Sequence, residues 1–235
     1  MKILEIIKKR INKSPPIEII KEQISESPPI DKIGNLQLDC TPRQPSNACF
    51  YSVMEKGKLL EYVDIQTPEI CMAAVENDGW ALQYVREQTP EICLEAVKQD
   101  SSALKYVKYQ TPEICLAAVR QCCAALYDVK DQTHQMCMEA VKQDGIALAW
   151  VEDKTYEICM AAVKQNGLAL ESIKKYQPYE MCLAAVKQNG KALRYVIEQT
   201  PELCQEAVKQ NKEALLYVKY NMDDVKNVQI DIEYK

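Results

Sequence analysis

One cysteine recurs every 22 residues along most of this chain, with a single interval of 23, and the residues around it recur in the same order. The copy from Thr89 to Gln110, TPEICLEAVKQDSSALKYVKYQ, shows the repeated frame most fully. A fixed period of this length indicates a repeat array, in which each unit buries its apolar face by stacking on its neighbours. The recurring cysteines are Cys49, Cys71, Cys93, Cys115, Cys137, Cys159, Cys182 and Cys204.

Each copy predicts two short helices. In the second copy, Thr67 is a good N-cap, Pro68 suits the first helical position, and Glu69 complements the positive end of the helix dipole. Apolar residues then follow at helical spacing. We expect a first helix of about 10 residues, closed by Gly79 in the left-handed conformation, and a second of about 8 residues over 80–87.

The fold class that follows is all-α. We predict an α-solenoid of eight short helix-turn-helix repeats over residues 45–221. Residues 1–44 are expected to form an N-terminal cap or a docking segment, and residues 222–235 a C-terminal cap or tail. A leucine-rich repeat has a compatible period, but it requires the L-x-x-L-x-L pattern of a strand, which the copies lack. The sixth copy holds one extra residue near 174–176, which should lie in a turn.

Three positions in the frame predict the core. Val at the ninth position and Leu at the sixteenth occur in all eight copies, as expected of core residues. The eighth position is Ala in seven copies and Ser52 in the first. A side chain this small predicts close approach of a neighbouring helix, where a larger residue would overpack the joint.

The chain has eleven cysteines, but it lacks the apolar stretch of a secretory signal, so we expect free thiols in a reducing compartment. The cysteine row is read as a stripe of small apolar side chains, with a redox or metal ladder as the alternative. Adjacent helices lie too far apart for disulfides between equivalent cysteines. The only histidine is His134 and no C-x-x-C occurs, so neither a metal site nor a cofactor is expected.

Cys122 and Cys123 differ from the other cysteines because they replace the Asx-Gly turn of the fourth copy. Exposure is expected there. Either the pair is reactive, or it is an incidental loop substitution.

Composition narrows the choice of partner. The chain has 235 residues, a net charge of -5 and a pI near 5.2, which disfavours a nucleic-acid binder. No apolar run is long enough for a transmembrane helix, so we expect no membrane partner and a cytoplasmic location. A row of Lys or Arg followed by Gln or Asn, as in Lys98 and Gln99, either reads a phosphate backbone or serves the C-terminal end of each helix. We favour the second interpretation.

The eighteenth position of the frame carries an aromatic residue in most copies, but the row is broken by Asp128 and Ser172 around Trp150. These residues, with Tyr127, are the candidate partner-binding patch, although drift of the repeat would explain the break equally well. Trp80 and Tyr156 are the next candidates.

The frame T-P-E-[IM]-C-x-x-A-V-K-Q-N-G-x-A-L-x-Y-V-x-x-Q resembles an uncharacterised repeat family, a domain of unknown function abundant in giant DNA viruses of amoebae and in protist-associated bacteria. The resemblance covers residues 45–221. It implies an α-helical array and a viral origin, with the host cytoplasm or the virion as the location. It brings no catalytic or binding residues.

These observations favour a non-enzymatic scaffold that presents an extended surface to a protein partner. A repeat-type binder of single-stranded RNA is the alternative, and a virion structural protein is a third. An enzyme is not expected, because no nucleophile–base pair, phosphate loop or metal signature occurs.

Overall fold

The computed structural model describes residues 47–219, where α-helices alternate with 3-10 helices and no strand occurs. The described range thus confirms the all-α repeat and excludes the leucine-rich alternative. Both predicted caps, residues 1–44 and 222–235, lie outside it. The α-helices are α3 (Asn47–Glu55), α4 (Pro68–Asn77), α5 (Pro90–Gln99), α6 (Pro112–Gln121), α7 (His134–Gln143), α8 (Tyr156–Gln165), α9 (Tyr179–Gln188) and α10 (Pro201–Gln210).

Each α-helix is followed by a 3-10 helix of six residues. These are η2 (Gly57–Tyr62), η3 (Gly79–Tyr84), η4 (Ser101–Tyr106), η5 (Cys123–Asp128), η6 (Gly145–Trp150), η7 (Gly167–Ser172), η8 (Gly190–Tyr195) and η9 (Lys212–Tyr217).

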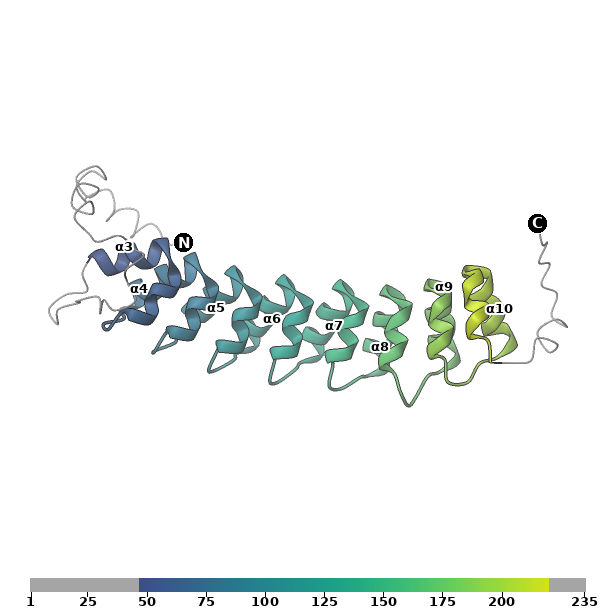
Figure 1. The fold of residues 1–235 in the computed structure, drawn as a ribbon. Helices are drawn as coiled ribbons and strands as arrows, with labels where there is room; N and C mark the ends of the chain where they lie inside the picture. Colours follow the sequence, from purple (N-terminus) through teal and green to yellow (C-terminus); the bar gives the residue numbers. More distant parts are fainter. Residues whose placement is uncertain (1–46, 220–235) are drawn as a thin grey trace. The chain divides into compact units, whose positions relative to one another are not determined.

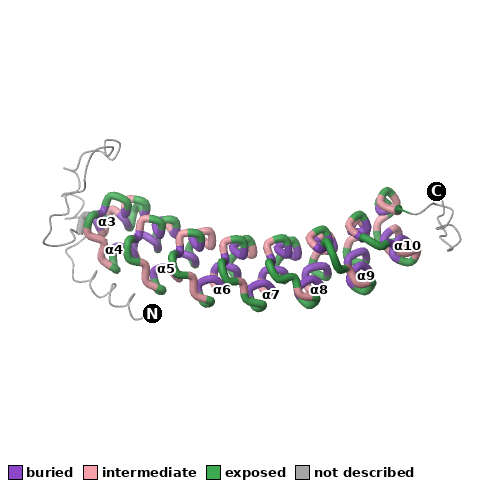
Figure 2. Tube along the Cα trace, turned by 90° about the horizontal axis from the view of Figure 1, so that it is seen from below, coloured by how far each residue is buried: buried purple, intermediate pink, exposed green. Residues whose placement is uncertain are grey.

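The repeats stack in sequence order. Each α-helix packs against the α-helices before and after it, and the 3-10 helices form a parallel row beside them. Figure 1 shows the connecting loops along one edge of this array. The buried residues lie between the two rows and between successive repeats (Figure 2). Every repeat therefore depends on its sequence neighbours for its core, as expected of a solenoid.

The start of each α-helix follows the predicted chemistry. The Thr67 hydroxyl accepts a hydrogen bond from the backbone N–H of Ile70, Pro68 occupies the first turn, and Glu69 lies there too. Equivalent threonines cap α5, α6, α7, α8 and α10. In the seventh copy Pro178 stands at the N-cap of α9 and supplies no side-chain bond.

The second helix of each copy differs from its prediction in type and length. Residues 79–84 form a 3-10 helix rather than an α-helix over 80–87. With three residues per turn, the positions of Gly79, Leu82 and Val85 fall on one side, and all three are buried. Buried residues on this side of the segment therefore recur every three residues, as in a 3-10 helix, and not at the spacing of an α-helix.

The predicted left-handed glycine is wrong, because no residue in the described range has a positive φ. Asp78 ends α4 in an extended conformation, and its carboxylate accepts a hydrogen bond from the N–H of Trp80. Glycine occurs at this position because the next repeat leaves no room for a side chain. A Cβ on Gly145 would clash with the backbone C=O of Ala162 in the next repeat. The small eighth-position alanine and this glycine form one close contact between repeats, and the alanines of α4 to α10 are fully buried.

A glutamine at the end of six of the connecting loops joins successive repeats. Gln132 donates to the C=O of Leu126 at 3.3 Å and to the C=O of Trp150 in the next repeat at 2.8 Å. Its Oε1 accepts from the N–H of Glu152 at 3.0 Å and from the Cys137 thiol at 3.5 Å. The whole donor and acceptor capacity of the amide is used. We call this side chain the loop clamp; it is present as Gln66, Gln88, Gln110, Gln132, Gln177 and Gln199.

A second amide, at the eleventh position, joins the repeats on the opposite side. Gln121 donates to the C=O of Lys98, the penultimate residue of α5 in the preceding repeat, at 2.8 Å. Gln165 also accepts from the N–H of Gly145 at 2.6 Å. The predicted role of these amides at helix C-termini is confirmed, with one difference: the carbonyl that each amide caps belongs to the preceding repeat.

Candidate binding surface

The cysteine row is buried, and its thiols act as hydrogen-bond donors. The repeated cysteines of α4 to α10 are at most 4% exposed. In six repeats the thiol lies 3.5–3.8 Å from the Oε1 of a loop clamp. The prediction of small apolar side chains accounts for the burial of these cysteines but not for the hydrogen bond. Alanine would fill the same position without donating that bond. Burial raises the pKa of the Cys71, Cys93 and Cys182 thiols to about 11, so the thiols stay protonated at neutral pH.

The expectation of free thiols is wrong at Cys49, whereas the other cysteines of the described residues are free. Cys49, in the first repeat, is disulfide-bonded. The separation of adjacent helices excludes disulfides only between equivalent cysteines of adjacent repeats, and the repeated cysteines from Cys71 to Cys204 are free. A disulfide from Cys49 to a cysteine outside this row is not excluded by that separation.

Cys122 connects α6 to η5, and Cys123 is the first residue of η5 rather than part of a turn. Cys122 is exposed, whereas Cys123 is half-buried and its pKa is raised, chiefly by burial. A raised pKa lowers the thiolate fraction and hence the reactivity of Cys123. Cys123 stands where most repeats have the tightly packed glycine, and α6 and α7 pack less closely than other neighbouring α-helices. The cysteine pair thus lies in the repeat whose α-helix packs least closely on the next one among the described helices.

Replacing Cys122 with aspartate should stabilise the protein. Asp or Asn caps η3, η4, η6, η7, η8 and η9 through its side chain, but Cys122 gives η5 no such bond. Restoring the acceptor in Cys122→Asp should add about 1 kcal/mol to the free energy of unfolding, measured by urea denaturation in reductant. Cys122→Ala is the matched control. Equal stability of the two variants would contradict the capping role.

The candidate partner-binding patch lies on the 3-10 row at its centre. Tyr127 and Asp128 end η5, Trp150 ends η6 and Ser172 ends η7, and these three helices pack in order. Tyr127 is 74% exposed, and the other three are half-buried. The fold therefore places the four predicted residues at the ends of three successive 3-10 helices.

The aromatic residues that flank this patch are engaged within the array. The Lys105 ammonium lies 3.7 Å from the centre of the Trp80 ring, and the Trp80 indole N–H donates to Asp100 at 2.7 Å. Arg194 lies over Tyr195 in the same way. The second-choice candidate Trp80 is thus part of a structural cluster, although it is 38% exposed.

One joint between repeats lacks the loop clamp, a feature that sequence reasoning missed. Lys154 replaces the glutamine between the fifth and sixth repeats, and its ammonium donates to the C=O of Val151. The Cys159 thiol turns to the backbone C=O of Lys154 instead. At each of the six other joints, the residue two places after the 3-10 helix donates its backbone N–H to the loop clamp of the preceding repeat. Lys174 is the equivalent residue here, and no clamp is present to accept from its N–H. The signal was in the sequence, because Lys154 breaks an otherwise regular glutamine row.

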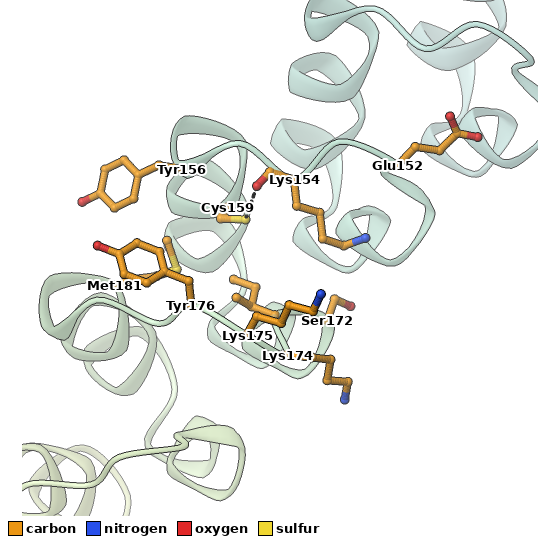
Figure 3. Close-up of a pocket in the computed structure, with 10 residues that line it drawn as sticks. Glu152, Lys154, Tyr156, Cys159, Ser172, Lys174, Lys175, Tyr176 and Met181 are labelled. Atoms are coloured by element: carbon orange, nitrogen blue, oxygen red, sulfur yellow. Dashed lines mark hydrogen bonds between the residues drawn. The ribbon is translucent and has the colours of Figure 1, made fainter.

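A cavity of about 450 Å³ lies at this joint. Its wall includes residues 173–176 of the connection between η7 and α9, which holds the extra residue of the sixth repeat in a loop, as predicted. Figure 3 shows Tyr156 and Tyr176 on one side of it and the ammonium groups of Lys154, Lys174 and Lys175 on the other. Ser172, from the predicted patch, and Tyr156, a second-choice candidate, both line the cavity.

In the row of Lys or Arg followed by Gln or Asn at the helix C-termini, the amides form hydrogen bonds within the array instead of lying free for a phosphate backbone. The glutamines at the eleventh position bond to the preceding repeat from Gln99 to Gln210. Among the neighbouring cations, Lys98 pairs with Glu95 and Arg120 with Glu139. The amides of this row therefore support the array and do not favour RNA recognition.

Within residues 47–219, no group of three or more His, Cys, Asp and Glu side chains is placed to hold a metal ion. His134 lies at the start of α7 with its Nε2 3.5 Å from a carboxylate oxygen of Glu157. None of the helices described is long and apolar enough to cross a membrane.

Comparison with protein families identifies the repeat. The model of a domain of unknown function, DUF4116, matches three times in tandem, at residues 67–111, 134–176 and 179–222. Each match spans two 22-residue units, and together they cover more than half of the chain. Comparison with curated proteins and with solved structures gave no significant match.

Proposed function

Because the chain belongs to the DUF4116 family of tandem helical repeats, whose description states no function, we propose that it is a non-enzymatic scaffold that binds a protein partner through its 3-10 row. Solenoids present long surfaces built from equivalent positions of successive repeats. Such a surface becomes specific where some repeats depart from the frame.

The observation that carries this proposal is the change in the 3-10 row at its centre. In the flanking repeats, a cation at the seventeenth position covers the neighbouring aromatic rings, as Lys105 covers Trp80 and Tyr106. In the central repeats that position holds Tyr127, Ala149 and Glu171, so no such cation covers Trp150.

Exposed Tyr and Trp side chains are the residue types most enriched at the energetic centres of protein interfaces. Tyr127 offers a largely exposed ring, and Trp150 stands next in the row between the smaller Asp128 and Ser172. The central patch therefore has two aromatic anchors with room around them for a partner's side chains.

The test compares capture of partners by the full chain and by two variants from a lysate of the source cells. Tyr127→Ala with Trp150→Ala should reduce capture of the specific partner by tenfold or more, since truncating a central interface aromatic typically costs about 2 kcal/mol. Tyr109→Ala is the control, because Tyr109 is an 85% exposed aromatic residue in a loop and is not one of the patch residues.

Two results would contradict the proposal. Capture unaffected by the double substitution would show that the patch is not the interface. Release of the bound material by ribonuclease, with steep weakening by salt, would favour the RNA-binding alternative instead.

A further inference from the structure

We propose that the cavity beside Lys154 binds an acidic peptide segment of a protein partner. This inference rests on the proposed function in taking the partner to be a protein. It adds a second contact site with its own chemistry, at the joint where the loop clamp is absent. The cavity volume lies within the range of pockets that hold small ligands or a few side chains.

The missing clamp defines the hydrogen bonds that an occupant can make. At the other joints a glutamine amide donates to the last C=O of the next 3-10 helix and accepts from the N–H two residues later, as Gln132 does with Trp150 and Glu152. The equivalent groups here are the Ser172 C=O and the Lys174 N–H. An occupant therefore meets one acceptor and one donor. A peptide supplies both partners, whereas a phosphate group at neutral pH supplies chiefly acceptors.

The charges in the cavity favour an anion. Lys154, Lys174 and Lys175 line it, against a single carboxylate from Glu152. None of the three lysines forms an ion pair with a carboxylate of the described residues. Figure 3 shows the Glu152 carboxylate directed away from the ammonium groups. Carboxylate side chains would be attracted to this positive charge and form charge-assisted hydrogen bonds with the lysines.

The opposite side of the cavity is aromatic. Tyr156 is 52% exposed and Tyr176 is 73% exposed, and both belong to the wall. Phenolic rings give apolar contact area with a polar end, which suits an apolar side chain flanked by acidic residues. The expected ligand is thus an extended segment with several Glu or Asp residues around one apolar residue.

Lys154→Gln tests this inference without endangering the fold. Glutamine is the residue at the six other joints, so the variant should restore the clamp, fill part of the cavity and remove one cation. We expect it to melt no lower than the unmodified chain. Lys130→Gln is the matched control, because it removes the same charge from an exposed lysine on a joint where the clamp is intact.

The probe is a fluorescein-labelled peptide, Gly-Glu-Glu-Phe-Gln-Glu-Glu-Gly, titrated with the full chain and followed by fluorescence anisotropy. We expect saturable binding, weakened at least tenfold by Lys154→Gln and less than twofold by Lys130→Gln. A version of the peptide with Lys in place of Glu should not bind. No saturable binding to the unmodified chain, or equal binding by both variants, would overturn the inference.

Two further measurements separate the alternatives. Competition by inorganic phosphate or by oligouridylate at concentrations matching the peptide would identify a general anion site and overturn the peptide assignment. Partner capture by Lys154→Gln distinguishes this site from the central patch. If that variant keeps the partner while Tyr127→Ala with Trp150→Ala loses it, and the peptide does not bind, the proposed function stands and only the cavity assignment fails.

Discussion

Replacing Gln132 with glutamate should destabilise the array by about 2–4 kcal/mol at pH 7, because the substitution removes two hydrogen-bond donors at the centre of a joint. The Gln132 amide nitrogen donates to the carbonyls of Leu126 and Trp150. A glutamate of the same shape would direct a charged oxygen at both carbonyls. Its other oxygen could still accept from the N–H of Glu152.

Thermal unfolding followed by circular dichroism measures this effect, which should lower Tm by roughly 4–16 °C for a chain of this size. The difference from the unmodified chain should shrink as pH falls towards about 4.3, the pKa of glutamate in the unfolded chain, because the buried carboxyl group takes up a proton above that pH and again donates a hydrogen bond. Gln83→Glu is the control, since Gln83 is exposed and its amide donates to the C=O of Trp80 within its own repeat. Equal melting temperatures of the two variants at pH 7 would refute the clamp.

Raising the pH should unfold the protein between about pH 9 and 11. Burial holds the pKa of the Cys71, Cys93 and Cys182 thiols at about 11, and it also raises the pKa of Cys115, Cys137, Cys159 and Cys204. In the unfolded chain thiols lose their protons near pH 8.5. The folded state therefore binds more protons in this window, so its stability falls as pH rises.

The loss of stability at high pH can be measured as a fall in Tm. The stabilisation is complete below about pH 8.5 and is lost as pH rises through 11, so Tm should be level from pH 7 to 8 and then drop steeply. Lysines also lose their charge near the upper end. The triple variant Cys71→Ser, Cys93→Ser, Cys182→Ser isolates the thiols, because serine still donates to the clamp but does not titrate there. Its curve should fall less steeply; matching curves would show that the buried thiols do not cause the loss.

Much of the local structure could be predicted from single repeats. Thr67 and Pro68 start an α-helix by chemistry that acts within one turn, and the predicted cap and helix length are confirmed. Recurring Val and Leu predicted the core for the same reason, since spacing alone places them on one face. The extra residue of the sixth copy was placed in a loop because a helix joint has no space for it.

The errors and omissions involve contacts between repeats. Gly79 was assigned to a left-handed cap, but its role is close approach to the following repeat. Cys137 was treated as an apolar side chain, but its thiol donates to Gln132 of the preceding repeat. The candidate patch stays a prediction, whereas the cavity was missed because it depends on an absent glutamine and a lengthened loop that meet at one contact between repeats.

The sequence by itself determined the period, the helical class, the helix starts and the buried positions, because these depend on interactions among residues a few places apart. Only the tertiary structure decided what each amide, thiol and glycine serves. The partners of the amides and glycines lie about twenty residues away and meet them only when one repeat stacks on the next. Each thiol bonds to a glutamine five residues before it, and that glutamine is itself held by the next repeat. A glutamine can bond to its own helix, to water or to a neighbour, and the geometry of stacking selects among these.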